Sequence, residues 1–233
     1  MKEKYSPSKR DNTSWESVGN WYQAIVGEDG HYYHKNVILP ALLKHMQLNE
    51  TENPLVLDLG CGPGILARQI PEKTPYIGVD LSSTLLRAAK AQDKEAAHEY
   101  HLGDITKPLP IKTTNCSHAT IVLALQNVEA PELAVKNAFK HLRANGRLFI
   151  VLNHPCFRVP RQSSWGVDDQ KKIQYRRIDR YAASLKIPIQ AHPSKGSSST
   201  TTWSFHHSLS TYSKMLKEAG FVIEEIDEWC SNK

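Results

Sequence analysis

A glycine-rich loop at residues 58–64 (DLGCGPG) is the segment of this chain best suited to hold a ligand. Glycines that follow a buried strand allow a tight turn and let a ligand press against bare backbone. The third glycine of the dinucleotide-binding fingerprint is missing, because Ile65 stands in its place, and Asp58 would repel a pyrophosphate. The loop therefore favours a ligand that carries an ammonium group near Asp58.

Two more aspartates follow the next two apolar runs. Asp80 lies 22 residues beyond Asp58, after the run 76–79, and Asp104 follows the run 99–102. A carboxylate at the end of a second strand can accept hydrogen bonds from both hydroxyls of a ribose. Asp104 can meet an adenine amino group while Ile105 packs on the ring. Each aspartate alone could simply end a strand or cap a helix, but three in register with the glycine loop favour one shared ligand.

Short apolar runs alternate with helical patterns through the middle of the chain. The runs predict strands at residues 55–59, 76–79, 99–102, 119–125 and 147–152, with a helix over 131–142. This alternation predicts an α/β fold with a doubly wound, mostly parallel, Rossmann-like sheet. Parallel strands end at one edge of the sheet, so the loop and the aspartates are expected to lie together there.

The regions that flank this core differ from it. Helical spacing predicts N-terminal helices over 14–26 and 33–46, in a helical cap of residues 1–53, and the core spans 54–152. Residues 153–207 contain prolines and a Ser/Thr tract, and we expect a substrate-side insertion there, an antiparallel cap after strand five. Residues 208–233 add a helix over 210–219 and a strand over 221–226 that complete the core, so the whole is one domain.

These blocks together resemble the class I S-adenosylmethionine-dependent methyltransferases, in particular the small-molecule branch known as the type 11 methyltransferase domain. The resemblance rests on VLDLGCGPG at 56–64, YIGVDLS at 76–82, GDI at 103–105 and ATIVLAL at 119–125. It implies S-adenosylmethionine as cofactor and S-adenosylhomocysteine as product, with the methionine end near the glycine loop, the ribose on Asp80 and the adenine on Asp104. The implied cofactor-binding residues are Asp58, Gly60, Cys61, Gly62, Gly64, Asp80, Leu81, Asp104, Ile105 and Leu123. The family fold usually ends in a hairpin of two strands, whereas only one strand is expected after the last helix here.

Segments outside the core supply candidates around the reacting groups. Tyr22, on the cofactor side, and Tyr33, on the substrate side, can cover a sulfonium by cation–π contact. His154 directly follows strand five and is the candidate general base, with His34 as a second candidate, although either histidine can instead bond only backbone. The candidate substrate-binding residues are Tyr33, His154, Arg158, Arg161, Arg176, Arg177 and Trp203. The arginines can pair with a carboxylate or phosphate, or form a solvated surface.

The composition is that of an ordinary globular protein, with 40% hydrophobic and 23% charged residues. No apolar run is long enough to span a bilayer, and the N-terminus has no signal-peptide pattern. The four cysteines are scattered, and no histidine has a partner at metal-ligand spacing. We therefore expect a cytoplasmic protein with reduced thiols and no metal.

The charge is concentrated where the substrate is expected. Residues 153–205 contain nine Lys or Arg and three Asp or Glu, so this segment accounts for the net charge of +5. A local basic surface suits an anionic small molecule at least as well as a nucleic acid. The Asn/Asp-Pro-Pro-aromatic motif of amino-directed base methylation is absent, because the chain reads LQNV at 125–128.

The sequence therefore predicts an enzyme that transfers a methyl group to a small, anionic or phenolic acceptor by in-line displacement. An RNA methyltransferase, a non-catalytic S-adenosylmethionine-binding or scaffold protein, and another S-adenosylmethionine-dependent chemistry on the same fold stay open as alternatives. Nucleic acid is not the favoured partner, and the sequence leaves the oligomeric state open.

Overall fold

The structure is a computed structural model that describes residues 15–16, 19, 27, 30–190 and 201–231. Its centre is a five-stranded parallel sheet in the order β3-β2-β1-β4-β5. The strands are β1 (Val56–Leu59), β2 (Tyr76–Asp80), β3 (His98–Leu102), β4 (Cys116–Val122) and β5 (Leu142–Val151). The predicted doubly wound α/β fold is confirmed, and the order reverses direction at β1, which places the glycine loop at the switch point.

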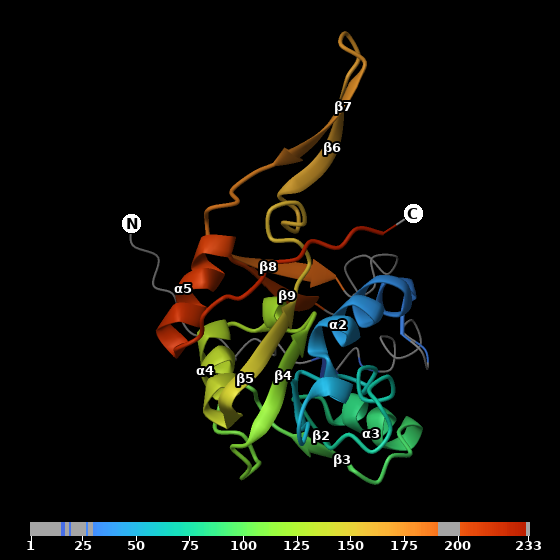
Figure 1. Cartoon of the computed structure of the whole chain (residues 1–233). Helices are drawn as coiled ribbons and strands as arrows, with labels where there is room; N and C mark the ends of the chain where they lie inside the picture. The colour runs from blue at the N-terminus through green and yellow to red at the C-terminus, as the bar shows by residue number, and fades with distance from the viewer. Residues whose placement is uncertain (1–14, 17–18, 20–26, 28–29, 191–200, 232–233) are drawn as a thin grey trace, which may run out of the picture.

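Helices cover both faces of this sheet (Figure 1). A short π-helix (His34–Ile38) leads into α2 (Leu39–Met46), which packs on the same face as α3 (Ser83–Gln92). The opposite face carries α4 (Pro131–His141) and α5 (Leu209–Ala219). Two short 3-10 helices lie at Leu48–Glu50 and Leu125–Asn127. The segment after the glycine loop forms successive turns over 62–69 and no regular helix.

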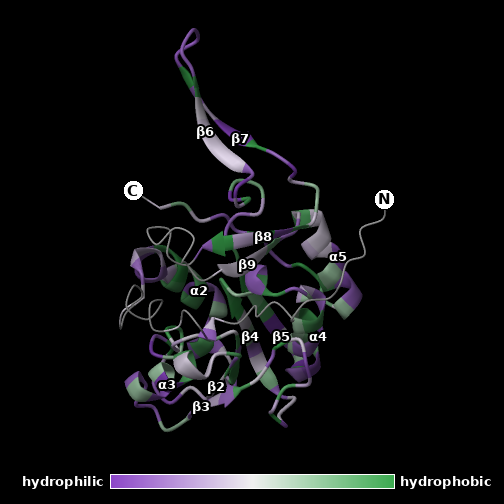
Figure 2. Ribbon diagram, turned by 180° about the vertical axis from the view of Figure 1, so that it is seen from behind, coloured by the Kyte–Doolittle hydropathy of each residue, from purple (hydrophilic) through white to green (hydrophobic). Residues whose placement is uncertain are grey.

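Alternation along the strands divides the core into two layers. In β1, Val56 packs with Leu42 and Met46 beneath α2, whereas Leu57 packs with Val135 beneath α4. Successive side chains of a strand point to opposite faces, so a strand covered on both faces is apolar throughout. Figure 2 shows the hydrophobic residues gathered where helices meet the sheet.

The insertion after β5 forms two antiparallel pairs, as predicted. They are β6 (Ser163–Asp168) with β7 (Ile173–Ile178), and β8 (Leu185–Gln190) with β9 (Thr201–His206). In the β8–β9 pair, β9 contacts the 3-10 helix at Leu125–Asn127. The β6–β7 hairpin projects away from the sheet (Figure 1). No residue of β6 or β7 lines the cavity described below, and the substrate-side role of the insertion stays a prediction.

The expectation of a strand over residues 221–226 is wrong. Helix α5 ends at Gly220, whose φ of 102° is the left-handed value that stops a helix. The following residues, 221–231, contain no strand, and Val222 is 86% exposed. Their apolar residues have strand propensity, but the segment lies beside β5 through side-chain contacts such as Arg147 with Glu224 at 3.5 Å, and no ladder forms. Edge strand β5 is thus left open on this side.

Most of the predicted helix over 14–26 lies outside the described residues. Within the part of the chain that the structure describes, no helix is long and apolar enough to cross a bilayer.

Candidate active site

The carboxyl ends of the parallel strands line one cavity of about 2530 Å³. Its wall includes residues that follow each of the five strands in turn, namely Gly60, Asp80, Asp104, Leu123 and His154. The same cavity extends along β5 to the C-terminal segment 221–231. Its size follows from the open edge of β5, because no strand fills the space between β5 and that segment.

The glycine loop presents backbone to this cavity. Gly60 has a φ of 78°, and a Cβ on it would lie 2.6 Å from the Ala124 Cβ, so only glycine fits there. Gly62 has a φ of 55°, and a Cβ on it would meet nothing within 4 Å. The open side of Gly62 is therefore space that a ligand can occupy against the backbone.

Asp80 fixes this loop and also faces the cavity. Its Oδ2 accepts from the Gly62 N–H and its Oδ1 from the Ser82 N–H, both at 2.8 Å. Burial raises the pKa of Asp80, while the N–H groups of Ser82 and Gly62 act in the opposite direction. Each carboxylate oxygen keeps a second lone pair, so two ligand hydroxyls can still bind.

Asp104 lies on the same wall, one strand farther along. Its Oδ1 accepts from the Thr106 N–H at 2.8 Å and from the Thr106 hydroxyl at 2.7 Å. Asp104, buried Ile105 and Thr106 all line the cavity. The arrangement pairs an available carboxylate oxygen with an apolar side chain, which suits the amino group and the face of a purine.

Asp58 is buried beneath the loop and does not line the cavity. It is 2% exposed, and its two oxygens accept from the Tyr76 hydroxyl at 2.8 Å and the Thr120 hydroxyl at 2.7 Å. Burial raises its pKa to about 6, although these two hydroxyls lower it. The carboxylate can therefore act on a ligand through its charge across the loop, while its direct contacts are to the protein.

The remaining candidate cofactor-binding residues also divide into those that line the cavity and those buried in the loop. Leu81 and Leu123 line the cavity, and Leu123 is held at a φ of 51° with its N–H on the Val151 carbonyl oxygen. Cys61 and Gly64 lie in the packed base of the loop. Tyr22 lies outside the described residues.

Of the two histidine candidates, His34 has the freer ring. It is buried on the cavity wall, and its Nδ1 has no hydrogen-bond partner among the described residues. Burial lowers its pKa, so the ring is neutral near pH 7. Tyr33 lies beside it on the same wall, half-exposed and stacked on His31.

His154 lines the cavity but has both ring nitrogens engaged. Its Nδ1 accepts from the backbone N–H groups of Cys156 and Phe157, and its Nε2 contacts a carboxylate oxygen of Glu228. A nitrogen that accepts two N–H groups carries no proton, so the proton is on Nε2 and faces Glu228. In this arrangement His154 holds the C-terminal segment and offers no free basic nitrogen.

The four candidate arginines differ in whether they line the cavity. Arg158 lines the cavity and has no ion pair within the described part of the chain. Arg176 donates to the Phe157 carbonyl oxygen and lies over the Trp165 ring, and Arg177 pairs with Asp179 at 2.9 Å. Arg161 is exposed and, like Arg176 and Arg177, is not on the cavity wall. The structure therefore brings only one of the four to the site.

Trp203 faces away from the cavity, beneath the ammonium of Lys186 at 4.8 Å. Its neighbours Thr202 and Ser204 point the other way and line the wall, because adjacent strand residues face opposite sides. Sequence reasoning missed these two, and also Thr106 and Gln126. The alternation of strand 201–206 was the signal that could have found Thr202 and Ser204.

Sequence reasoning also missed Glu16, which lies near the N-terminus of α3. Its carboxylate accepts from the hydroxyls of Ser82, Ser83 and Thr84, and from the Thr84 N–H at 3.1 Å. These hydrogen bonds, led by that of Ser82, lower the pKa of Glu16 to about 2. The contact ties the N-terminal region to the turn that carries Asp80.

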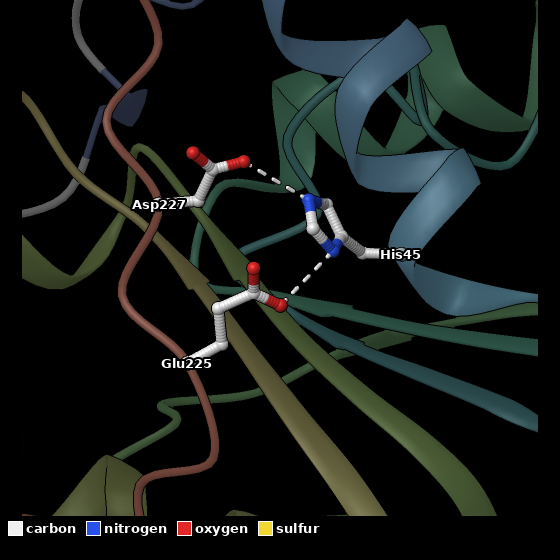
Figure 3. Close-up of side chains that lie close together, drawn as sticks. All are labelled: His45, Glu225 and Asp227. Atoms are coloured by element: carbon white, nitrogen blue, oxygen red, sulfur yellow. Dashed lines mark hydrogen bonds and ion pairs between the residues drawn. The ribbon is translucent and has the colours of Figure 1, made fainter.

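The C-terminal segment meets α2 through His45 (Figure 3). The Nε2 of His45 lies 3.1 Å from an Asp227 oxygen, and its Nδ1 lies 3.5 Å from a Glu225 oxygen. These three side chains are close enough to share a cation. However, each ring nitrogen faces its own carboxylate, whereas a metal ion would bind a single ring nitrogen, so the geometry is that of an ion pair.

Comparison with known proteins places this site in a family. Residues 57–150 match the family model described as a methyltransferase domain. Over 146 residues the chain is 26% identical to a ubiquinone biosynthesis O-methyltransferase of Hydrogenovibrio crunogenus, and the match covers 61% of this chain and 59% of that relative. The chain thus spans less than two thirds of that relative's length.

Solved structures agree on the fold. An S-adenosylmethionine-dependent methyltransferase from Mesorhizobium loti has a TM-score of 0.68 and 26% identity, over 88% of this chain and 87% of that one. A putative S-adenosylmethionine-dependent methyltransferase from Listeria monocytogenes shares the fold with a TM-score of 0.63 and 24% identity, over 80% and 82% of the two chains. Residues 57–150 thus form a methyltransferase domain, and with the glycine loop and the two cavity-facing aspartates in place the chain is similar to the class I S-adenosylmethionine-dependent methyltransferases.

Proposed function

We propose that this protein transfers a methyl group from S-adenosylmethionine to a small, anionic or phenolic acceptor. The observation that carries the proposal is that Asp80, Asp104 and Arg158 all line the same cavity. A cofactor held at the first two residues would share that space with an acceptor near the third.

The residues present fit the cofactor. Gly62 leaves its Cα side open, Asp80 retains lone pairs for a ribose, and Asp104 with Ile105 suits an adenine. The buried charge of Asp58 lies under the loop, where an ammonium group is favoured. S-adenosylmethionine supplies an activated methyl group, and the chain supplies position and alignment for its in-line transfer.

The acceptor side needs orientation more than proton transfer. Arg158 would pair with an acidic group, and Tyr33 would cover a cationic centre. The neutral His34 ring, with its unpaired Nδ1, is the better placed candidate to accept a phenolic proton. The Hydrogenovibrio relative is an O-methyltransferase, which supports an oxygen acceptor. The four free cysteines support a reducing location, for which we propose the cytoplasm.

Calorimetry and a methyl-transfer assay test the proposal together. The protein should bind S-adenosylmethionine and transfer a labelled methyl group to a member of a hydroxybenzoate panel. Arg158→Ala should weaken acceptor use at least tenfold while leaving cofactor affinity nearly unchanged, and Arg177→Ala, on the projecting hairpin, is the matched control. Cofactor binding without turnover would favour a non-catalytic protein. Salt-sensitive transfer into RNA would favour the nucleic-acid alternative.

A further inference from the structure

A second, small chamber of about 30 Å³ adjoins the cavity. It lies between the 3-10 helix at Leu125–Asn127, the segment after β5 and the end of β9. The two spaces share seven wall residues, which are Gln126, Asn153, Pro155, Arg158, Pro160, Ser204 and Tyr212. A chamber of this volume holds about one water molecule or one small polar group.

Two polar atoms on the chamber residues have no partner. The Oε1 of Gln126 and the Nε2 of His207 are both buried, and neither makes a hydrogen bond within the part of the chain that the structure describes. An unpaired buried polar atom costs about 1–3 kcal/mol, so such atoms usually have a partner supplied by water or a ligand. Two residues that line one small chamber thus each have a polar atom that a bound group could pair.

The other contacts of these side chains leave these two atoms available to a group in the chamber. Gln126 donates its Nε2–H to the Leu123 carbonyl oxygen at 2.9 Å, and its Oε1 has no partner among the described residues. The Nδ1 of His207 lies 3.1 Å from the Ser184 hydroxyl, and the ring packs edge-on against Tyr212. Burial lowers the pKa of His207, with a further contribution from His206. The ring is therefore neutral, and its Nε2 can donate when the Ser184 hydroxyl donates to Nδ1.

The chemistry of the walls selects one type of group. A carboxylate only accepts hydrogen bonds, so it would be repelled by the Gln126 oxygen. An ammonium group would be repelled by the guanidinium of Arg158. A hydroxyl can donate to Gln126 and accept from His207, and it is small enough for the chamber.

We propose that this chamber is a subsite for a hydroxyl group of the methyl acceptor, with Gln126 and His207 as its specificity-determining residues and Arg158 beside an adjacent acidic group. The proposal rests on the proposed function and names the acceptor as a hydroxylated acid.

Binding of benzoate and of 2-, 3- and 4-hydroxybenzoate to protein saturated with S-adenosylhomocysteine tests this subsite. At least one hydroxylated isomer should bind about tenfold more tightly than benzoate, as one well-formed hydrogen-bonded group provides. Gln126→Met and His207→Phe should bind that isomer and benzoate equally, and His207→Phe retains the ring against Tyr212. Gln174→Met, on β7, is the control that should keep the preference.

Other outcomes separate the two proposals. Three results would overturn the subsite: equal affinity of the wild type for all four probes, no binding of any probe, or a preference that survives both substitutions. A structural water would then occupy the chamber. Binding of S-adenosylhomocysteine, measured in the same titrations, reports on the proposed function independently. Loss of that binding would contradict the proposed function. The comparison of benzoate with its hydroxylated isomers, made in protein without S-adenosylhomocysteine, would then test the subsite by itself.

Discussion

At the scale of single residues, Asp58 and Asp80 have the same side chain at the ends of neighbouring strands but different surroundings. Asp80 accepts from two backbone N–H groups and faces the cavity. Asp58 accepts from two hydroxyls in the core, with its pKa raised to about 6 by burial. The first is suited to direct contact with a ligand, and the second to an effect through charge.

Asp80→Ala should weaken binding of S-adenosylmethionine by about 2 kcal/mol or more, because two charge-assisted hydrogen bonds to the ribose are lost. Calorimetry on the folded variant measures this directly. Glu99→Ala, which removes an exposed carboxylate from β3, is the control and should bind normally. Unchanged affinity in Asp80→Ala would remove Asp80 from the binding site.

Asp58→Asn should stabilise the fold at neutral pH. The folded pKa of about 6 exceeds the ordinary 3.8, so the folded state binds the proton more tightly and stability falls as the pH rises from about 4 to 6. That difference corresponds to about 3 kcal/mol, which is the upper limit of the gain expected above pH 6. The variant and the wild type should be similar below pH 4.

Urea denaturation across this pH range checks the prediction. The difference in stability between the wild type and Asp58→Asn should therefore change between pH 4 and 7. A constant difference would show that the pKa of Asp58 is not raised in the folded protein. The affinity for S-adenosylmethionine should have the opposite pH dependence to the folding stability. It should increase with pH through about 6 in the wild type, because an ammonium group favours the ionised carboxylate, and this dependence should be absent in the variant.

At the scale of elements, the sequence was informative wherever one segment contains its own signal. Strands β1, β2 and β4 are mostly apolar and are buried along almost their whole length, because helices cover both of their faces. The positions after them could therefore be assigned to one edge. The strand expected at 221–226 did not form because a ladder also needs a partner strand, and the adjacent acids Glu224 and Glu225 contact Arg147 and His45 through their side chains instead.

The acceptor side was less predictable for the same physical reason. Gln126 and His207 line one chamber because β9 returns to the 3-10 helix at Leu125–Asn127, about eighty residues earlier in the chain. His45 and Glu225 are farther apart still. A single sequence has no local pattern that reports such contacts, whereas the spacing of Asp58 and Asp80 follows from two successive parallel strands, β1 and β2, joined by one short connection.

Two glycines of the same loop should respond differently to alanine. A Cβ on Gly62 meets nothing, so Gly62→Ala should cost only the strain of a φ of 55°, about 1 kcal/mol, while its methyl group obstructs the cofactor. A Cβ on Gly64 would lie 2.7 Å from the Tyr100 hydroxyl and 3.1 Å from the Ala89 Cβ, so Gly64→Ala should destabilise the fold more. Melting temperature and cofactor affinity, measured for both variants, separate the effects. Equal loss of stability in the two would contradict this assignment.

At the scale of the whole molecule, one body holds the cavity and one element stands apart from it. The C-terminal segment crosses the cavity and is held by His45, Arg147 and His154 from separate elements. The β6–β7 hairpin, in contrast, extends beyond the body with Trp165 64% exposed and a hydrophilic turn at its tip (Figure 2).

The separation of this hairpin has a consequence for limited proteolysis. Lys171 and Lys172 lie in its turn, away from the sheet and both ligand subsites. Trypsin should therefore make its first cut within residues 30–190 after one of these lysines, because the turn can enter a protease without opening the core. Mass spectrometry identifies the cut, and S-adenosylhomocysteine should still raise the melting temperature of the nicked protein. An earlier cut inside the sheet, or a nicked chain that no longer responds to S-adenosylhomocysteine, would mean that the hairpin supports the active site after all.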